Sequence, residues 1–180
     1  MHEVAKIEHQ RIAQALEELV ERVVARHRET PALAVAGIAN GGVVFARKLV
    51  QLLALRLCRD LPLGTVNIAF HRDDIGLKPI PLNTAATDLP FSVDDATVIL
   101  ADDVFHTGRT ARAALNELLD QGRPARVELA VLCDRGGRTL PILPDYTGFP
   151  LETSPEHRVE VQLDFEYPIR DCVRVLAPSA

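Results

Sequence analysis

Residues 98–110, VILADDVFHTGRT, decide the expected fold. An apolar run typical of a buried strand leads into two adjacent acids, Asp102 and Asp103, and a Thr-Gly-Arg-Thr turn then opens a helix. Neighbouring side chains on a strand point to opposite faces of the sheet, so a sheet gains little from paired carboxylates. The pattern therefore indicates a ligand site at the end of a strand.

Outward from this stretch, apolar runs alternate with helical patterns. We expect helices over residues 3–28, 43–57 and 110–120, a turn over residues 146–148, and strands over residues 33–38, 65–70, 97–101, 126–133, 159–163 and 173–176. Strands that alternate with helices predict βαβ units and a mostly parallel sheet. The expected class is α/β, with one domain over residues 1–180, because no linker or repeat divides the chain.

The composition is that of a globular protein, with 180 residues, 47% hydrophobic residues and a net charge of −5. No apolar run approaches the ~20 residues of a membrane span, and the N-terminus lacks the apolar stretch of a signal peptide. We therefore expect a cytoplasmic protein with no membrane partner. Its three cysteines are expected to be buried, reduced thiols. The negative charge gives no overall attraction to nucleic acid.

Polar loops follow four of the predicted strands, at residues 39–42, 71–74, 102–109 and 134–137. Ligands of open α/β sheets bind beyond the carboxyl ends of the strands, so these loops are expected to share one site. A glycine turn at a helix N-terminus suits phosphate. Two acids repel a bare phosphate, but they suit a sugar phosphate, whose hydroxyls or Mg²⁺ they would bind. The alternative, in which one acid caps the helix and the other is solvated, stays open.

The same thirteen residues resemble the phosphoribosyl-pyrophosphate (PRPP) signature of type I phosphoribosyltransferases. Residues 71–74 (HRDD), 107–115, 119–142 and 145–148 (DYTG) narrow this resemblance to the PyrR family, whose members regulate pyrimidine operons and are uracil phosphoribosyltransferases. The resemblance implies a type I phosphoribosyltransferase fold. Its mostly parallel central sheet is flanked by helices and carries a small hood of short strands.

The resemblance also implies roles for residues 102–110. Asp102 and Asp103 would hold the ribose hydroxyls, act as catalytic residues and bind Mg²⁺. The neighbouring residues would complete the PRPP site: Val104, Phe105, His106, Thr107, Gly108, Arg109 and Thr110.

Three further loops receive roles in the same way. Gly41 and Gly42 would let backbone N–H groups reach the diphosphate. Arg72 would be a catalytic residue at the root of a loop, residues 71–95, that closes over PRPP. Asp134 and Arg135 would stand beside the base. For each loop, an ordinary polar turn is the structural alternative.

The implied reaction joins uracil to PRPP and gives UMP and diphosphate, with Mg²⁺ as cofactor and a homodimer as the assembly. This chain departs from the family pattern at Asn40-Gly41-Gly42, which lacks the usual arginine, at His71 and His106, where tyrosine is usual, and at residues 137 and 148–154. These departures put uracil specificity and RNA binding in doubt, and two alternatives to the uracil enzyme stay open. One is a nucleotide-responsive RNA-binding regulator, disfavoured by the net charge, and the other is a related enzyme acting on another substrate.

Overall fold

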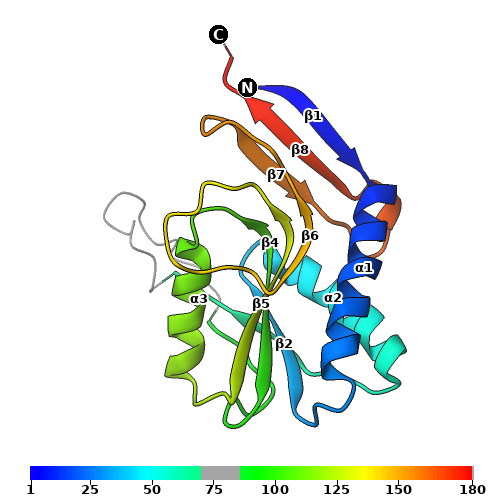
Figure 1. Ribbon diagram of the computed structural model, residues 1–180, viewed down its shortest axis with the longest axis vertical. Helices are drawn as coiled ribbons and strands as arrows, with labels where there is room; N and C mark the ends of the chain where they lie inside the picture. The colour runs from blue at the N-terminus through cyan, green and yellow to red at the C-terminus, as the bar shows by residue number, and fades with distance from the viewer. Residues whose placement is uncertain (70–85, 180) are drawn as a thin grey trace.

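The computed structural model of the protein describes residues 1–69 and 86–179 (Figure 1). A five-stranded parallel sheet with the order β3-β2-β4-β5-β6 forms its centre. The strands are β2 (Leu33–Ile38), β3 (Leu63–Val66), β4 (Thr97–Phe105), β5 (Arg126–Asp134) and β6 (Tyr146–Pro150). The predicted α/β class with a mostly parallel sheet is confirmed.

Helices cover both faces of this sheet. Helices α1 (His9–His27) and α2 (Gly42–Leu57) pack on one face, and α3 (Arg109–Asp120) packs on the other (Figure 1). A strand covered on both faces is apolar along its whole length, and β2 is buried at every residue. The sheet therefore separates two apolar cores, one around Phe45 and Leu49 and the other around Val98 and Leu118.

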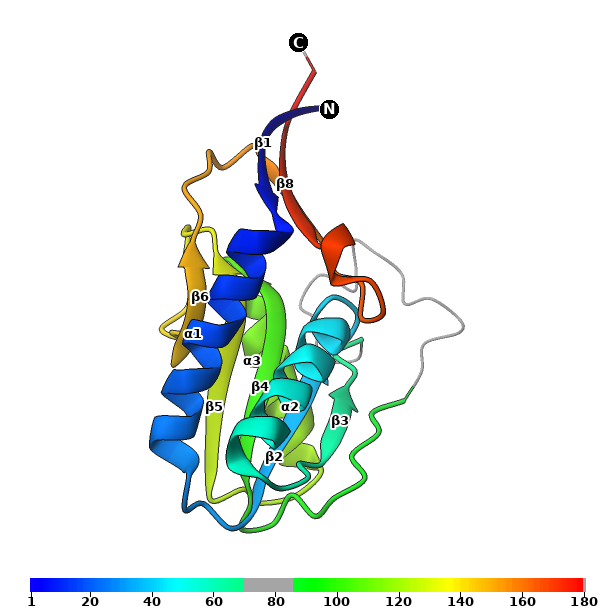
Figure 2. The ribbon, with the colours of Figure 1, turned by 90° about the vertical axis from the view of Figure 1, so that its right-hand side faces the viewer.

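A small antiparallel sheet with the order β1-β8-β7 forms a hood beyond the carboxyl ends of the central strands (Figure 2). It consists of β1 (His2–Glu8), β7 (Arg158–Gln162) and β8 (Cys172–Ala177), with a 3₁₀ turn, η1 (Pro168–Arg170), before β8. The expected hood of short strands is confirmed, although it includes the N-terminal segment.

Some element boundaries differ from the predictions for reasons of backbone pairing. Residues 3–8 form β1 and not the first turns of a helix, because their backbone pairs with β8. Residues 146–148 begin β6 and are not a turn, since they pair with β5 and bury Tyr146. Strand β4 continues through the acid pair to Phe105. Strand β3 ends at Val66, where the Asn67 side chain accepts a hydrogen bond from Ala69 N–H.

The expectation for the three cysteines meets the structure only in part. Cys133 and Cys172 are buried and unpaired as expected, but Cys58 is exposed where α2 ends. Among the residues that the structure describes, no helix has both the length and the apolar character needed to cross a bilayer.

Candidate active site

The candidate site lies where the strand order of the sheet reverses. Strands β2 and β4 are neighbours, and the chain leaves β2 toward β3 on one side and β4 toward β5 on the other. Such a switch point opens a crevice at the carboxyl ends of the two strands. It brings together the loop after β2 and the acids at the end of β4. The two were predicted to share a site, and they lie in contact.

The acid pair is largely withdrawn from water. Asp102 is 8% exposed, Asp103 is half-buried, and the Asp103 N–H donates to Asp102 Oδ1 at 3.0 Å. Burial, followed by the charge of Asp103, raises the pKa of Asp102 well above its usual range. Burial also raises the pKa of Asp103, against the opposing effect of backbone hydrogen bonds. The free protein therefore holds two carboxyl groups that a hydroxyl-rich or cationic ligand would stabilise.

We call residues 106–110 the phosphate cradle, after their expected role. Gly108 joins β4 to α3 with φ 88°, a left-handed conformation that favours glycine. The Thr107 hydroxyl oxygen accepts a hydrogen bond from Arg109 N–H at 3.3 Å. The first N–H groups of α3 have no acceptor within the helix, and they carry the positive end of its dipole. The cradle is therefore suited to an anion.

A cavity of about 140 Å³ lies in this cradle. Asp102 stands at one wall and the start of α3 at another, so a single ligand can reach both the carboxylate and the cradle. The cavity is lined by Asp102, Val104, Phe105, His106, Thr107, Gly108, Thr110, Ala111 and Leu129. Seven of these nine residues were predicted to bind PRPP; Ala111 and Leu129 were not.

The loop between β2 and α2, residues 39–42, faces the acids; we call it the diphosphate loop. A Cβ atom on Gly41 would overlap the carboxylate of Asp103, and one on Gly42 would overlap the carbonyl oxygen of Ala101. The close approach of the β4 backbone thus requires glycine at position 42, whereas a side chain at position 41 would have to displace the Asp103 carboxylate. The Ala39–Asn40 peptide bond is cis, and Ala39 N–H donates to Val66 O at 2.9 Å.

The base turn, residues 134–137, follows β5 beside the cradle. Asp134 Oδ1 accepts from Gly136 N–H at 2.9 Å, and Arg135 N–H donates to Phe105 O at 3.0 Å. Arg135 Nη2 donates to Ser154 O at 3.2 Å, while its buried Nε has no hydrogen-bond partner among the described residues. The guanidinium is therefore held by the segment after β6 and keeps one donor unused.

His106 links the cradle to the base turn. A Cβ on Gly137 would lie 2.7 Å from His106 Nε2, so the imidazole occupies the space beside this glycine. Thr107 O accepts hydrogen bonds from the N–H groups of Thr139 and Leu140, both at 3.1 Å. Burial, and then the charge of Arg135, lowers the pKa of His106, which favours the neutral imidazole.

The structure thus brings together all the predicted site residues that it describes. Arg72 and most of the proposed closing loop lie outside the described residues. Residues 86–95 are described, and there Asp88 exchanges two backbone hydrogen bonds with Thr65. The sequence predicted that Cys133 is buried but not that it contacts the site, where its thiol donates to Asp103 O at 3.5 Å. Its only sequence signal was its place next to Asp134 at the end of a strand.

The acid pair fits Mg²⁺ by its chemistry. Mg²⁺ is usually held by one or two carboxylates together with substrate phosphates and water. Asp102 and Asp103 are two adjacent carboxyl groups whose pKa values are raised by burial, so a cation beside them would relieve an unfavourable environment. No cluster of three or more metal-binding side chains occurs within the described residues, so such an ion would depend on oxygen atoms of the substrate.

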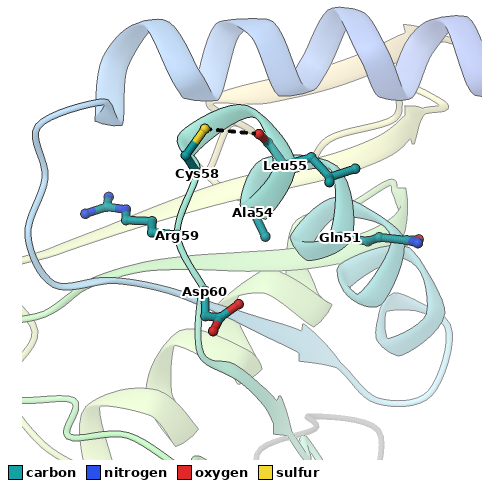
Figure 3. Close-up of a pocket in the computed structure, with 6 residues that line it drawn as sticks. All are labelled: Gln51, Ala54, Leu55, Cys58, Arg59 and Asp60. Carbon is teal, nitrogen blue, oxygen red and sulfur yellow. Dashed lines mark hydrogen bonds between the residues drawn. The ribbon is translucent and has the colours of Figure 1, made fainter.

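A second hollow, of about 540 Å³, lies at the other end of α2 and carries none of the predicted site residues (Figure 3). It is lined by Gln51, Ala54, Leu55, Cys58, Arg59 and Asp60, and Cys58 Sγ donates to Leu55 O at 3.7 Å. Figure 3 shows that the Arg59 side chain points away from the helix residues of this group. We assign no function to it.

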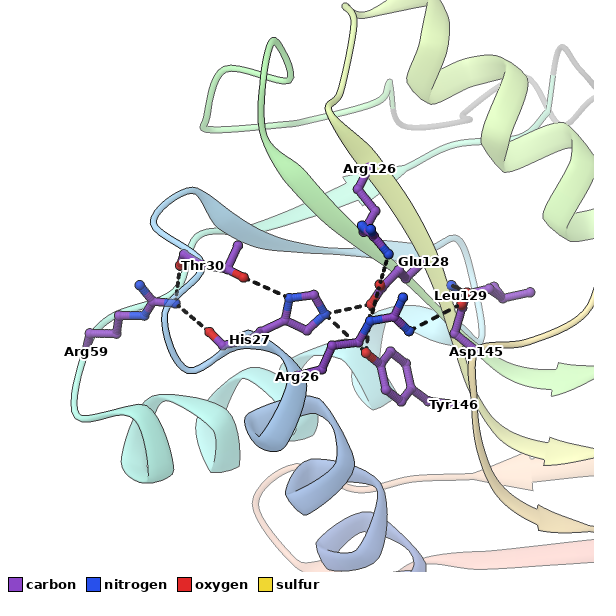
Figure 4. Close-up of polar contacts among 9 residues, drawn as sticks. All are labelled: Arg26, His27, Thr30, Arg59, Arg126, Glu128, Leu129, Asp145 and Tyr146. Atoms are coloured by element: carbon purple, nitrogen blue, oxygen red, sulfur yellow. Dashed lines mark hydrogen bonds and ion pairs between the residues drawn. The ribbon is translucent and has the colours of Figure 1, made fainter.

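A buried polar network lies at the opposite end of the sheet from the candidate site (Figure 4). Glu128, 2% exposed, accepts hydrogen bonds from the Tyr146 hydroxyl and contacts His27 Nε2, both at 2.7 Å. Arg26 and Arg126 reach its other oxygen at 3.1 and 3.4 Å. Burial alone would raise the pKa of Glu128, but these hydrogen bonds and charges outweigh it and lower the pKa. Both oxygens of the buried Glu128 carboxylate thus have partners, and the network joins α1 to β5 and β6.

Comparison with known proteins gives the same family. Residues 4–166 match the phosphoribosyl transferase domain family. The chain is 43% identical over 155 residues to "Bifunctional protein PyrR" of Syntrophobacter fumaroxidans, covering 84% of this chain and 82% of that protein. It is 48% identical over 141 residues to the protein of the same name from Akkermansia muciniphila, covering 78% of each chain.

Solved structures share the fold at lower identity. The hypoxanthine phosphoribosyltransferase of Trypanosoma cruzi superposes with a TM-score of 0.70 at 17% identity, over 99% of this chain and 98% of that one. A hypoxanthine-guanine phosphoribosyltransferase from Bacillus anthracis gives a TM-score of 0.66 at 16% identity, over 87% and 88% of the two chains. At this identity the likeness concerns the fold alone.

Together, the parallel sheet, the acid pair at its switch point, the cradle and the hood define a type I phosphoribosyltransferase. The chain belongs to the phosphoribosyl transferase domain family and, within it, to the PyrR proteins.

Proposed function

We propose that this chain transfers the phosphoribosyl group of PRPP to uracil and releases UMP and diphosphate. The observation that carries the proposal is the acid pair, buried Asp102 and half-buried Asp103, which lies between a glycine-rich loop and an anion-suited cavity. PRPP has a diol between a phosphate and a diphosphate, so its groups match these three features in order. Membership of the PyrR family supports uracil as the base.

In this proposal each part of the site binds one part of the substrates. The cradle binds the 5-phosphate through the first N–H groups of α3 and the hydroxyls of Thr107 and Thr110. Asp102 and Asp103 accept hydrogen bonds from the ribose hydroxyls. The N–H groups of the diphosphate loop approach the diphosphate, and Asp134 and Arg135 hold the base.

The protein then acts mainly by positioning the reactants and by stabilising charge. The bond from the base nitrogen to the anomeric carbon forms while the bond from that carbon to the diphosphate oxygen breaks. The electron pair leaves with the diphosphate, and the base gives up its N–H proton to water. Mg²⁺, held by Asp102 and Asp103 with substrate oxygens, would supply positive charge to the departing diphosphate.

A panel of bases incubated with PRPP and Mg²⁺, with diphosphate release as the readout, tests this function. We expect release with uracil, and little with purine bases. Release with another base alone would keep the enzyme class and replace the substrate. No release with any base would contradict the proposal.

A second candidate function is RNA-binding regulation by a nucleotide effector. The observation that favours it is the word "bifunctional" in the names of the relatives. The net charge of −5 counts against it. An RNA-binding assay separates the two candidates.

A further inference from the structure

A buried ion pair attaches the hood to helix α2. Lys48 Nζ donates to Asp171 Oδ2 at 2.7 Å, and the two side chains are 7% and 4% exposed. Beside this pair, the guanidinium carbon of Arg47 lies 5.7 Å from the centre of the Phe165 ring. In Figure 2 the turn before β8 lies against the N-terminal part of α2. Neither charge belongs to the proposed substrate site.

The other oxygen of the Asp171 carboxylate stabilises the turn formed by residues 164–171, which leads into β8. Asp171 Oδ1 accepts from Asp164 N–H at 2.8 Å, and Asp164 Oδ1 in turn accepts from Glu166 N–H and Tyr167 N–H at 3.0 and 2.9 Å. One side chain therefore both shapes residues 164–171 and fixes them to α2. A buried charge that loses its partner is strongly destabilising, so this attachment depends on both members of the pair.

The hood also holds the base turn, through the segment that leads from β6 into β7. Leu151 N–H donates to Asp134 O at 2.7 Å, and the Thr153 hydroxyl donates to Arg135 O at 3.4 Å. Strand β7 then pairs with β8, which begins next to Asp171. Helix α2 begins at the diphosphate loop. A continuous set of contacts therefore runs from the diphosphate loop through α2 and the hood to the base turn.

We propose that Lys48 and Asp171 form a positioning pair that aligns the base turn with the diphosphate loop. The inference rests on the proposed function, because it assigns the base and the diphosphate to those two segments. Reactants held on separate parts of a protein react only when those parts are aligned, and a misplacement of about 1 Å costs up to about 100-fold in rate. Lys48 bonds to Asp171, and Asp171 bonds also to Asp164 N–H; none of these groups belongs to the cradle or the acid pair, so PRPP affinity should depend on the ion pair little.

The test uses two variants and a matched control. Asp171→Asn and Lys48→Met each break the pair. Glu128→Gln makes the same carboxyl-to-amide change as Asp171→Asn, at a buried carboxylate that also has a partner at 2.7 Å but lies away from the hood. We expect kcat with uracil to fall about tenfold or more in both test variants, while the Kd for PRPP, measured by calorimetry, changes less than about twofold. Glu128→Gln should keep the wild-type kcat.

Amide hydrogen exchange of the free protein supplies a readout that does not need activity. In Asp171→Asn and Lys48→Met, exchange should quicken at residues 135–137 and 151–154, and in Glu128→Gln it should not. The inference would be overturned if exchange quickened only within residues 164–171, or if kcat stayed unchanged. It would also be overturned if the loss of kcat were matched by the control variant or by an equal loss of PRPP affinity. If the wild type makes no nucleotide from any base, the proposed function fails, and the exchange comparison alone then decides the coupling.

Discussion

At the scale of single residues, the acids of the candidate site lower the stability of the folded protein, and in the proposed function they bind the ligand. Asp102 and Asp103 are adjacent and withdrawn from water, and their pKa values are raised by burial. An acid whose pKa is higher in the folded than in the unfolded protein binds protons more tightly when folded. Its contribution to stability therefore falls as pH rises from the unfolded-state pKa toward the folded-state value, and it stays unfavourable above that range.

Replacing both acids, Asp102→Asn and Asp103→Asn, should consequently have opposite effects on stability and binding. We expect a higher Tm for the free double variant at pH 7, and a Tm that depends less on acid pH. PRPP affinity should fall at least about tenfold, since each lost hydrogen bond to a charged acceptor is worth about 1.5–3 kcal/mol. Calorimetric titration with PRPP and thermal unfolding at several pH values measure the two effects. Unchanged PRPP affinity in a folded double variant would refute the assignment of the acids.

Gly108 illustrates a different requirement, that of backbone conformation. Its φ of 88° is costly for a residue with a side chain, and a Cβ would lie 3.3 Å from the Cβ of Leu140. Gly108→Val should therefore destabilise the protein by about 1–2 kcal/mol through strain alone and abolish PRPP binding by distorting the cradle. Asn116→Ala, an exposed change on the same helix, should leave the affinity for PRPP unchanged. Normal PRPP binding by Gly108→Val would show that the cradle does not hold the phosphate.

At the scale of elements, burial decides which strands can be recognised from their local sequence pattern. Strands β2, β4 and β5 are covered on both faces, so their apolar runs are visible without any partner. Strand β1 is mostly exposed, and only its backbone pairing with β8 makes it a strand. No local pattern reports a partner 175 positions away, as the pairing of His2 with Ala177 requires. The helical periodicity of α1 was therefore extended too far toward the N-terminus.

The network around Glu128 gives a prediction at this scale, because it joins α1 to the edge of the sheet (Figure 4). Tyr146→Phe removes the hydroxyl that donates to Glu128 and leaves this carboxylate one hydrogen bond short. We expect a loss of about 1–3 kcal/mol in the free energy of unfolding by urea, with the KM for PRPP unchanged.

The same network predicts how stability depends on acid. Hydrogen bonds and charges lower the pKa of Glu128 in the folded protein, so its stabilisation is present above the unfolded-state value of 4.5 and is lost as pH falls through the folded-state pKa. Tyr146→Phe should weaken this acid sensitivity. An unchanged unfolding free energy at pH 7, or an altered KM for PRPP, would contradict the purely structural role given to this network.

At the scale of the whole molecule, the residues of the candidate site were easier to predict from sequence than the contacts between distant segments around it. The acids, the cradle and the two glycines could be predicted because chemistry at the carboxyl ends of strands leaves short, dense motifs such as residues 98–110. Ala111, Leu129 and the Lys48–Asp171 pair could not, since their roles arise from contacts between segments far apart in sequence. The homodimer expected from the resemblance stays a prediction, which analytical ultracentrifugation would check.

RNA binding depends on the charge of the surface as a whole. The arginines that could form a basic face are largely engaged by the protein itself. Arg11 lies 3.9 Å from Glu18, Arg158 and Arg174 each lie 3.4 Å from Glu160, and Arg22 donates to the Thr147 carbonyl. Each nearby acid cancels charge that RNA phosphates would otherwise attract. Binding to RNA depends strongly on the number of phosphates that a protein neutralises.

We therefore expect weak or undetectable binding to a pyrimidine-operon leader RNA at about 150 mM salt in the presence of UMP. Filter binding at several salt concentrations measures it, because the slope of log K against log salt is about −0.7 for each phosphate engaged on a single strand. Glu160→Gln is a useful companion variant, since it releases Arg158 and Arg174 from their shared partner. If pairing of arginines limits RNA binding, this variant should bind RNA more tightly, with a steeper slope. Tight, sequence-selective binding by the wild type, weakened by mutation of the same arginines, would instead establish the regulator function and overturn the prediction.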